Sequence, residues 1–123
     1  MTVQGVGFVG MRTDRLEETV NLFQNVIGIP LTRRSSDFVA FTLADGALLE
    51  LFGPASASYA VFTTGPVFGL RVEDFDATRR AMLAAGVDFI GGVQHADGMS
   101  WQHFRCPDGT IAEITGPGSP PER

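Results

Sequence analysis

The sequence contains the same set of motifs twice, and this repetition constrains the fold more than any other feature. The stretch 10–19, GMRTDRLEET, resembles the stretch 69–78, GLRVEDFDAT. Farther along, residues 45–54 and 108–117 both follow the pattern D-G-x-x-x-E-x-x-G-P. The two matches occur in the same order and at nearly the same separation, so duplication explains them better than chance. We therefore predict a chain built from two similar halves.

Each half is predicted to contain a strand, then a helix, then three strands. In the first half, Asp14 is expected to cap a helix, with Glu17 completing a capping box. The apolar residues of this helix follow at helical spacing up to Gly28, namely Leu16, Val20, Phe23 and Ile27. The strands of this half are predicted at 6–12, 37–43 and 48–52, with a hairpin turn at Asp45-Gly46.

The second half follows the same plan. Its helix is predicted to run from Phe75 through Arg79 and Met82 and to end at Gly86. Its strands are predicted at 67–72, 87–90, 100–105 and 111–115, with a turn at Pro107-Asp108-Gly109.

We expect one structural domain with four segments. They are a first module at 1–54, a linker at 55–65, a second module at 66–117 and a disordered tail at 118–123. The disordered end is expected from the run Gly116 to Pro121, because glycine and proline there do not continue a strand.

Composition excludes several classes of chemistry. All nine basic residues are arginine, so lysine Schiff bases and P-loop lysines are excluded. Cys106 is the single cysteine, which rules out an intrachain disulfide and suits a reducing compartment. The net charge of −5 argues against a nucleic-acid partner. We find neither a signal peptide nor an apolar stretch long enough for a membrane span, so a cytoplasmic protein is expected.

Two motifs carry a resemblance to a known family. Residues 106–113, CPDGTIAE, are close to the pattern D-P-D-G-N-x-x-E, and the strand–helix segment 8–28 is the second match. With these motifs, residues 6–117 resemble the vicinal oxygen chelate superfamily of glyoxalase I, bleomycin-resistance proteins and extradiol dioxygenases. The resemblance implies an α+β fold in which two βαβββ modules form a curled, mostly antiparallel eight-stranded open barrel around a cavity. It also implies a homodimer.

The resemblance further implies where a metal would bind. Enzymes of the family hold a divalent metal through residues of the first and last strands of each module, usually histidine and glutamate. In this sequence the first-strand positions are Phe8 and Val67, and the last-strand positions are Glu50 and Glu113. Hydrocarbon side chains donate no lone pair, and two carboxylates alone are a poor site for zinc, nickel or iron. We expect no cofactor and no transition metal, the alternative being a weakly held hard divalent ion.

Three residues are candidates for acid–base chemistry: Glu50, Glu113 and His103. If both glutamates face one cavity, repulsion and burial should raise the pKa of one of them. The alternatives are glutamates that face solvent or that remain from a lost metal site. His103 precedes Glu113 across the turn, and an in-line register would place both side chains on one face. A slip of one residue would place His103 on the other face, and a histidine bonded within the sheet is equally compatible. His95 is expected on a loop.

Six residues are candidates for ligand binding. Arg12 and Arg71 occupy matched positions, where they could neutralise the glutamates, bind an anionic ligand through planar guanidinium groups, or lie in water. An apolar pocket would take its lining from the other four candidates, Phe8, Phe52, Val67 and Trp101.

The function we expect is the binding of a small organic molecule in an apolar, partly acidic cavity without the transition metal of the family. Bleomycin-resistance-like sequestration belongs to this class, and an acidic cavity would favour a cationic or hydrogen-bond-donating ligand. The alternative is an enzyme, a lyase, isomerase or dioxygenase, using Glu50, Glu113 and His103 in a rearranged metal site or in metal-free acid–base catalysis. A third possibility is a structural or regulatory domain whose cavity is filled by Phe8, Phe52 and Trp101.

Overall fold

The computed structural model describes residues 2–56, 65–106 and 109–121. Its eight strands have the hydrogen-bonded order β2-β3-β4-β1-β5-β8-β7-β6, so the predicted α+β fold with an open eight-stranded sheet is confirmed. No helix in these described ranges is long and apolar enough to cross a membrane. In chain order the elements are β1 (Val3–Arg12), α1 (Leu16–Asn21), a π-helical segment (Leu22–Ile27), β2 (Leu31–Ser35), β3 (Phe38–Thr42), β4 (Leu48–Phe52), β5 (Val67–Val72), α2 (Phe75–Ala84), β6 (Asp88–Ala96), β7 (Met99–Arg105) and β8 (Ile111–Pro117).

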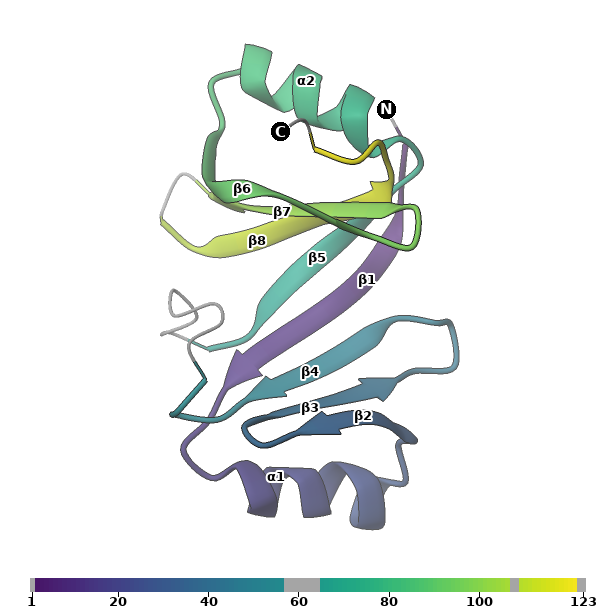
Figure 1. Ribbon diagram of the computed structural model, residues 1–123, viewed down its shortest axis with the longest axis vertical. Coiled ribbons are helices and arrows are strands. Elements are labelled where there is room, and N and C mark those ends of the chain that lie inside the picture. The colour runs from purple at the N-terminus through teal and green to yellow at the C-terminus, as the bar shows by residue number, and fades with distance from the viewer. Residues whose placement is uncertain (1, 57–64, 107–108, 122–123) are drawn as a thin grey trace. The chain divides into compact units, whose positions relative to one another are not determined.

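The chain forms two compact units with the same internal plan (Figure 1). The N-terminal unit comprises Phe8–Val67, and the C-terminal unit comprises Phe68–Arg123 together with Met1–Gly7. In the N-terminal unit β2–β3 and β3–β4 are antiparallel, and β4 pairs with β1 in parallel. In the C-terminal unit β6–β7 and β7–β8 are antiparallel, and β8 pairs with β5 in parallel. The two units therefore have the same strand pairing, as the duplication of the motifs predicts.

The repeated Gly-Pro pair marks a position where the chain has no room for a side chain. A Cβ on Gly116 would lie 2.3 Å from the carbonyl oxygen of Val72, and a Cβ on Gly53 would lie 2.1 Å from Oδ1 of Asp37. Both distances are shorter than real contacts. At Gly116 the neighbour is backbone, so glycine is required there, whereas at Gly53 the neighbour is a side-chain carboxyl group that can shift. The structure thus gives a physical reason for the glycine in the second copy of the motif.

In each unit one face of the sheet packs on a helix. Leu16 and Val20 of α1 form a core with Val39, Phe41 and Leu51. Phe75 of α2 forms the corresponding core with Val72 and Ile114. Because strand residues alternate between faces, the residues between these core positions point to the opposite face, which we call the helix-free face. In the C-terminal unit it carries Gly69, Arg71, Glu113, Thr115, Trp101 and His103.

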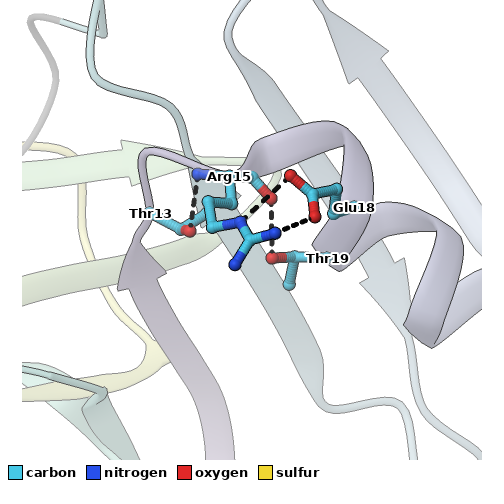
Figure 2. Close-up of polar contacts among 4 residues, drawn as sticks. All are labelled: Thr13, Arg15, Glu18 and Thr19. Carbon is cyan, nitrogen blue, oxygen red and sulfur yellow. Dashed lines mark hydrogen bonds and ion pairs between the residues drawn. The ribbon is translucent and has the colours of Figure 1, made fainter.

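The predicted helix cap at Asp14 is wrong. The helix begins at Leu16, after Arg15, and no side chain caps it. Figure 2 shows the arrangement that replaces a capping box: Thr13 Oγ1 accepts a hydrogen bond from the Arg15 N–H at 3.0 Å, and Arg15 pairs with Glu18. The chain turns one residue later than predicted because Thr13, rather than Asp14, satisfies the backbone donor at this corner.

The helical spacing predicted for Ile27 is also not maintained. After Asn21 the helix widens to a π-helix, and Gly28 N–H donates to the carbonyl oxygen of Phe23 at 3.0 Å. The wider turn leaves Ile27 59% exposed, whereas Phe23 still packs on the core. The strand that follows, β2, was not delimited in the sequence because its charged pair Arg33-Arg34 obscures the alternation.

Two further corrections concern the C-terminal unit. His95 is not on a loop but in β6, and its Nδ1 lies 2.8 Å from Ser100 Oγ. Gly116 and Pro117 belong to β8 rather than to a disordered end. The residues after them are also held, because the Ser119 N–H donates to Asp76 Oδ2 at 2.9 Å and its carbonyl accepts from Ser100 Oγ at 3.1 Å. Most of the predicted linker and part of the Pro107-Asp108-Gly109 turn lie outside the described residues.

The tight approach at Gly116 gives a first prediction. Gly116→Ala should lower the free energy of unfolding by roughly 1–3 kcal/mol, because the new methyl group collides with backbone that cannot rotate away. Urea denaturation followed by circular dichroism measures the change.

The matched control is Gly92→Ala in β6, where an added Cβ meets nothing within 4 Å. Its free energy of unfolding should stay within about 0.5 kcal/mol of the wild type. Equal stability of the two variants would show that the close approach at Gly116 does not exist in solution.

Candidate functional site

Four strands of the C-terminal unit place a row of residues across the helix-free face, with Glu113 near its middle. Glu113 of β8 pairs with Gly69 of β5 on one side and with His103 of β7 on the other. His103 in turn pairs with Ile90 of β6. We call this row the glutamate row. The in-line register between His103 and Glu113 is the one of the two predicted alternatives that brings their side chains together.

Glu113 and His103 form a buried contact, which is an ion pair only when His103 carries a proton. His103 Nε2 lies 3.0 Å from Glu113 Oε2, and each residue is only 5% exposed. Burial raises the pKa of the Glu113 carboxyl, and the contact with His103 acts in the opposite direction. The pair can hold a proton on either partner within one hydrogen-bonding distance, which is the arrangement that acid–base chemistry requires.

A second row lies one step along the same strands. Arg71 of β5 pairs with Thr115 of β8, Thr115 pairs with Trp101 of β7, and Trp101 pairs with Gln94 of β6. Trp101 Nε1–H donates to Gln94 Oε1 at 3.1 Å. We call this row the arginine row. Its members are at least partly exposed, whereas Glu113 and His103 are buried. The arginine row is therefore one side from which solvent reaches this face.

Thr115 and Gln94 were not singled out in the sequence. Strand alternation places Thr115 on the face of Glu113, two residues earlier in the predicted strand, but Thr115 was not among the predicted site residues. Gln94 gave no such signal, because Gly91-Gly92 suggested that the strand ends before it. In the structure β6 continues beyond these glycines through an irregularity between Ile90 and Gln94.

The equivalent glutamate of the N-terminal unit has different neighbours. Glu50 of β4 pairs with Gly10 of β1, as Glu113 does with Gly69, but its other partner is Ala40 of β3 instead of a histidine. Phe8 and Phe52 are 6% and 2% exposed, and the Phe52 ring lies 5.2 Å from that of Phe38. The glutamate of this unit therefore lies on a more hydrocarbon-rich face. That Glu50 and Glu113 share one cavity stays a prediction.

The two matched arginines also differ. Arg12 Nη1 donates hydrogen bonds to the carbonyl oxygens of Gly53 at 2.9 Å and Ser56 at 3.0 Å. Its guanidinium group thereby holds the chain after β4. Arg71 makes one long contact, 3.5 Å from Nη2 to the carbonyl oxygen of Val6. Within the described ranges, no ion pair includes Arg71.

The positions that correspond to histidine ligands are occupied by buried hydrocarbon. Phe8 lies two residues before Gly10 on the strand beside Glu50, and Val67 lies two residues before Gly69 on the strand beside Glu113. They are 6% and 3% exposed. Among the described residues, no group of three or more histidine, cysteine, aspartate or glutamate side chains could hold a metal ion. The side chains at the four matched positions, two hydrocarbons and two carboxylates, do not fit the transition metal of the family.

Comparison with known proteins agrees with this fold. The family model described as the glyoxalase/bleomycin resistance protein/dioxygenase superfamily matches residues 5–114. No curated protein sequence matches the chain significantly.

Solved structures provide further matches. Methylmalonyl-CoA epimerase from Mycobacterium tuberculosis is 19% identical, with a TM-score of 0.73 over 96% of this chain and 90% of that one. A superfamily member from Vibrio splendidus is 19% identical, with a TM-score of 0.65 over 94% and 99%. The Mn(II)-bound glyoxalase from Novosphingobium aromaticivorans is 17% identical, with a TM-score of 0.73 over 98% of this chain and 42% of that one. At these identities the likeness establishes the fold alone.

The buried carboxyl group gives a second prediction, on pH and stability. Because the pKa of Glu113 is raised on folding, its contribution to stability is complete below the pKa of the unfolded chain. That contribution is lost as the pH rises through the higher pKa of the folded state. The glutamine of Glu113→Gln stays neutral at every pH. The free energy of unfolding of this variant, relative to that of the wild type, should therefore increase as the pH rises from acidic to neutral. Urea denaturation at a series of pH values measures this difference.

Glu73→Gln, which changes an exposed carboxylate next to α2, serves as the control and should follow the wild-type profile. A constant difference between Glu113→Gln and the wild type across the series would contradict the raised pKa.

Proposed function

This chain belongs to the glyoxalase/bleomycin resistance protein/dioxygenase superfamily, and we propose that it binds a small organic molecule on the helix-free face of its C-terminal unit without a transition metal. The observation that carries this proposal is the buried Glu113–His103 pair. A cytoplasmic homodimer with no nucleic-acid or membrane partner completes the proposal.

The pair is better explained by function than by stability. Burying a carboxylate and an imidazole in a sheet costs desolvation energy, and apolar residues at these positions would pack at lower cost. The equivalent position in the other unit holds Ala40, so this sheet arrangement does not need a histidine there. Groups with a shifted pKa gather at binding and catalytic sites, where their environment is fitted to a ligand.

The chemistry of the available donors supports a site without a transition metal. Two hydrocarbon side chains stand at the positions where zinc, nickel or iron would need imidazole nitrogen. Both are buried, so they place hydrocarbon rather than a metal ligand near each glutamate. The partly exposed indole of Trp101 offers a flat apolar surface for the hydrocarbon part of an organic ligand.

A second candidate function is metal-independent proton transfer. It is favoured by the position of His103 Nε2 at 3.0 Å from Glu113 Oε2, since the pair can take a proton from a carbon acid and return one. Methylmalonyl-CoA epimerases are among the solved structures with this fold. Proton exchange is therefore a suitable reaction to test.

Ligand binding that does not depend on metal is the third prediction. In the presence of EDTA, a set of small organic fragments should still shift backbone amide resonances of β5, β7 and β8 in ¹H–¹⁵N NMR spectra. The physical reason is that the polar groups of this face are side chains of the chain itself, not a bound ion.

The control is elemental analysis of protein purified without chelators, which should find transition metal far below one equivalent. Fragment binding that EDTA abolishes and zinc, nickel or manganese restores would contradict the proposal. Fragment shifts confined to the helix-packed faces would contradict the assignment of the site.

Proton transfer gives the fourth prediction. If Glu113 and His103 act as acid and base, the protein should exchange the α-proton of methylmalonyl-CoA for deuterium in D₂O, as followed by ¹H NMR. Glu113→Gln should slow this exchange about 100-fold or more, because the variant has no carboxyl group to accept the proton.

Glu73→Gln should exchange at the wild-type rate and serves as the matched control. If Glu113→Gln exchanges the proton as fast as the wild type, the Glu113–His103 pair is not the acid and base of the reaction. No exchange above the rate in buffer would leave ligand binding as the function.

A further inference from the structure

We infer that the ligand of this site is an organic anion, a small carboxylate whose charged group binds Arg71 while its hydrocarbon part lies against Trp101. This inference rests on the proposed function and names the chemical class of the ligand. It differs from the expectation of a cationic or hydrogen-bond-donating ligand, which follows from the glutamates alone.

Duplication provides an internal comparison for Arg71. Arg12 occupies the equivalent position in the N-terminal unit, and two backbone carbonyls at 2.9 and 3.0 Å accept its hydrogen bonds. Arg71 has only the long contact of 3.5 Å with Val6, and no carboxylate pairs with it in the described part of the chain. Of the two matched arginines, Arg71 thus keeps its fork of donors available.

The backbone beside Arg71 is shaped to accommodate its side chain. A Cβ on Gly7 of β1 would lie 3.3 Å from Arg71 Nε and 3.4 Å from Arg71 Cβ, and a Cβ on Gly5 would lie 3.9 Å from Nη1. The side chain therefore lies along a strip of β1 that bears no side chains. This strip keeps the half-exposed guanidinium group on the helix-free face, where a planar anion can approach it.

The neighbours of Arg71 supply the remaining parts of a site. Trp101 is in the same row, separated from Arg71 only by Thr115. Glu113 and His103 occupy the adjacent row at the two corresponding strands. A ligand whose carboxylate binds Arg71 would cover Thr115, contact the indole and reach the Glu113–His103 pair.

The glutamate does not exclude an anion from this face. Glu113 lies beside His103, and when the two side chains hold one proton between them the pair carries no net charge. Arg71 then supplies the positive charge of the face, and a carboxylate would neutralise it through two parallel hydrogen bonds.

The test uses three planar probes of nearly equal shape and different charge: benzoate, benzamide and benzamidine. Trp101 is the only tryptophan in the chain, so its fluorescence reports directly from the arginine row. Benzoate should change this fluorescence saturably and bind more tightly than either of the other probes. Arg71→Gln should lower the affinity for benzoate by about tenfold or more. Arg71→Lys should lower it less, because lysine keeps the positive charge but lacks the paired N–H donors of the guanidinium group.

The matched control is Arg80→Gln on the exposed side of α2, which removes the same charge and should leave benzoate affinity within about twofold. Circular dichroism melting shows whether each variant is folded. If Arg71→Gln does not fold, the relative affinities of the three probes for the wild-type protein still test the inference.

Tighter binding of benzamide or benzamidine than of benzoate would overturn the anionic ligand and leave the proposed function standing. Benzoate affinity that is unchanged in folded Arg71→Gln would overturn the role of Arg71. Absence of binding by all three probes would contradict both the inference and small-molecule binding at this face.

Discussion

The arrangement of the C-terminal unit depends on one electrostatic requirement. A carboxyl group buried in a sheet must either contact a polar partner or take up a proton and become neutral. Glu113 is only 5% exposed, and the sheet meets the requirement by placing His103 directly across the strand pair, 3.0 Å away. That contact exists only in the in-line register of β7 and β8, because a shift of one residue would turn His103 to the face of α2. The same register determines the row that contains Arg71, Thr115 and Trp101.

The two units have the same strand plan but have diverged at the positions that carry charge. Both glutamates lie beside a glycine of a parallel strand, and in both units a Gly-Pro pair lies at or just after the end of the last strand. On this common frame, Ala40 stands where the other unit has His103, and Arg12 binds backbone where Arg71 does not. The arginine of the N-terminal unit thus holds backbone, whereas the arginine of the C-terminal unit keeps its donors available on the helix-free face.

Much of the fold was predictable because it follows from local patterns. The strands Leu48–Phe52 and Val67–Val72 were delimited correctly by their apolar residues and neighbouring turns, and the pairing of β3 with β4 follows from Asp45-Gly46. The failures occur where tertiary contacts replace a local signal. Thr13 takes the place of Asp14 at the start of α1, a π-helical turn exposes Ile27, and hydrogen bonds from Ser119 hold a segment that composition suggested was disordered.

The sequence by itself determined the duplication, the α+β class and the inventory of chemical groups, because repeats, alternation and residue types are written in the order of the chain. It also located Phe8 and Val67 at positions where no metal ligand can come from the side chain. Only the tertiary structure decided that His103 faces Glu113, that β6 brings Gln94 to Trp101, and that Arg71 rather than Arg12 keeps its donors available. These outcomes depend on strand register and on which backbone carbonyls lie within reach, and both are set by residues far apart in the chain.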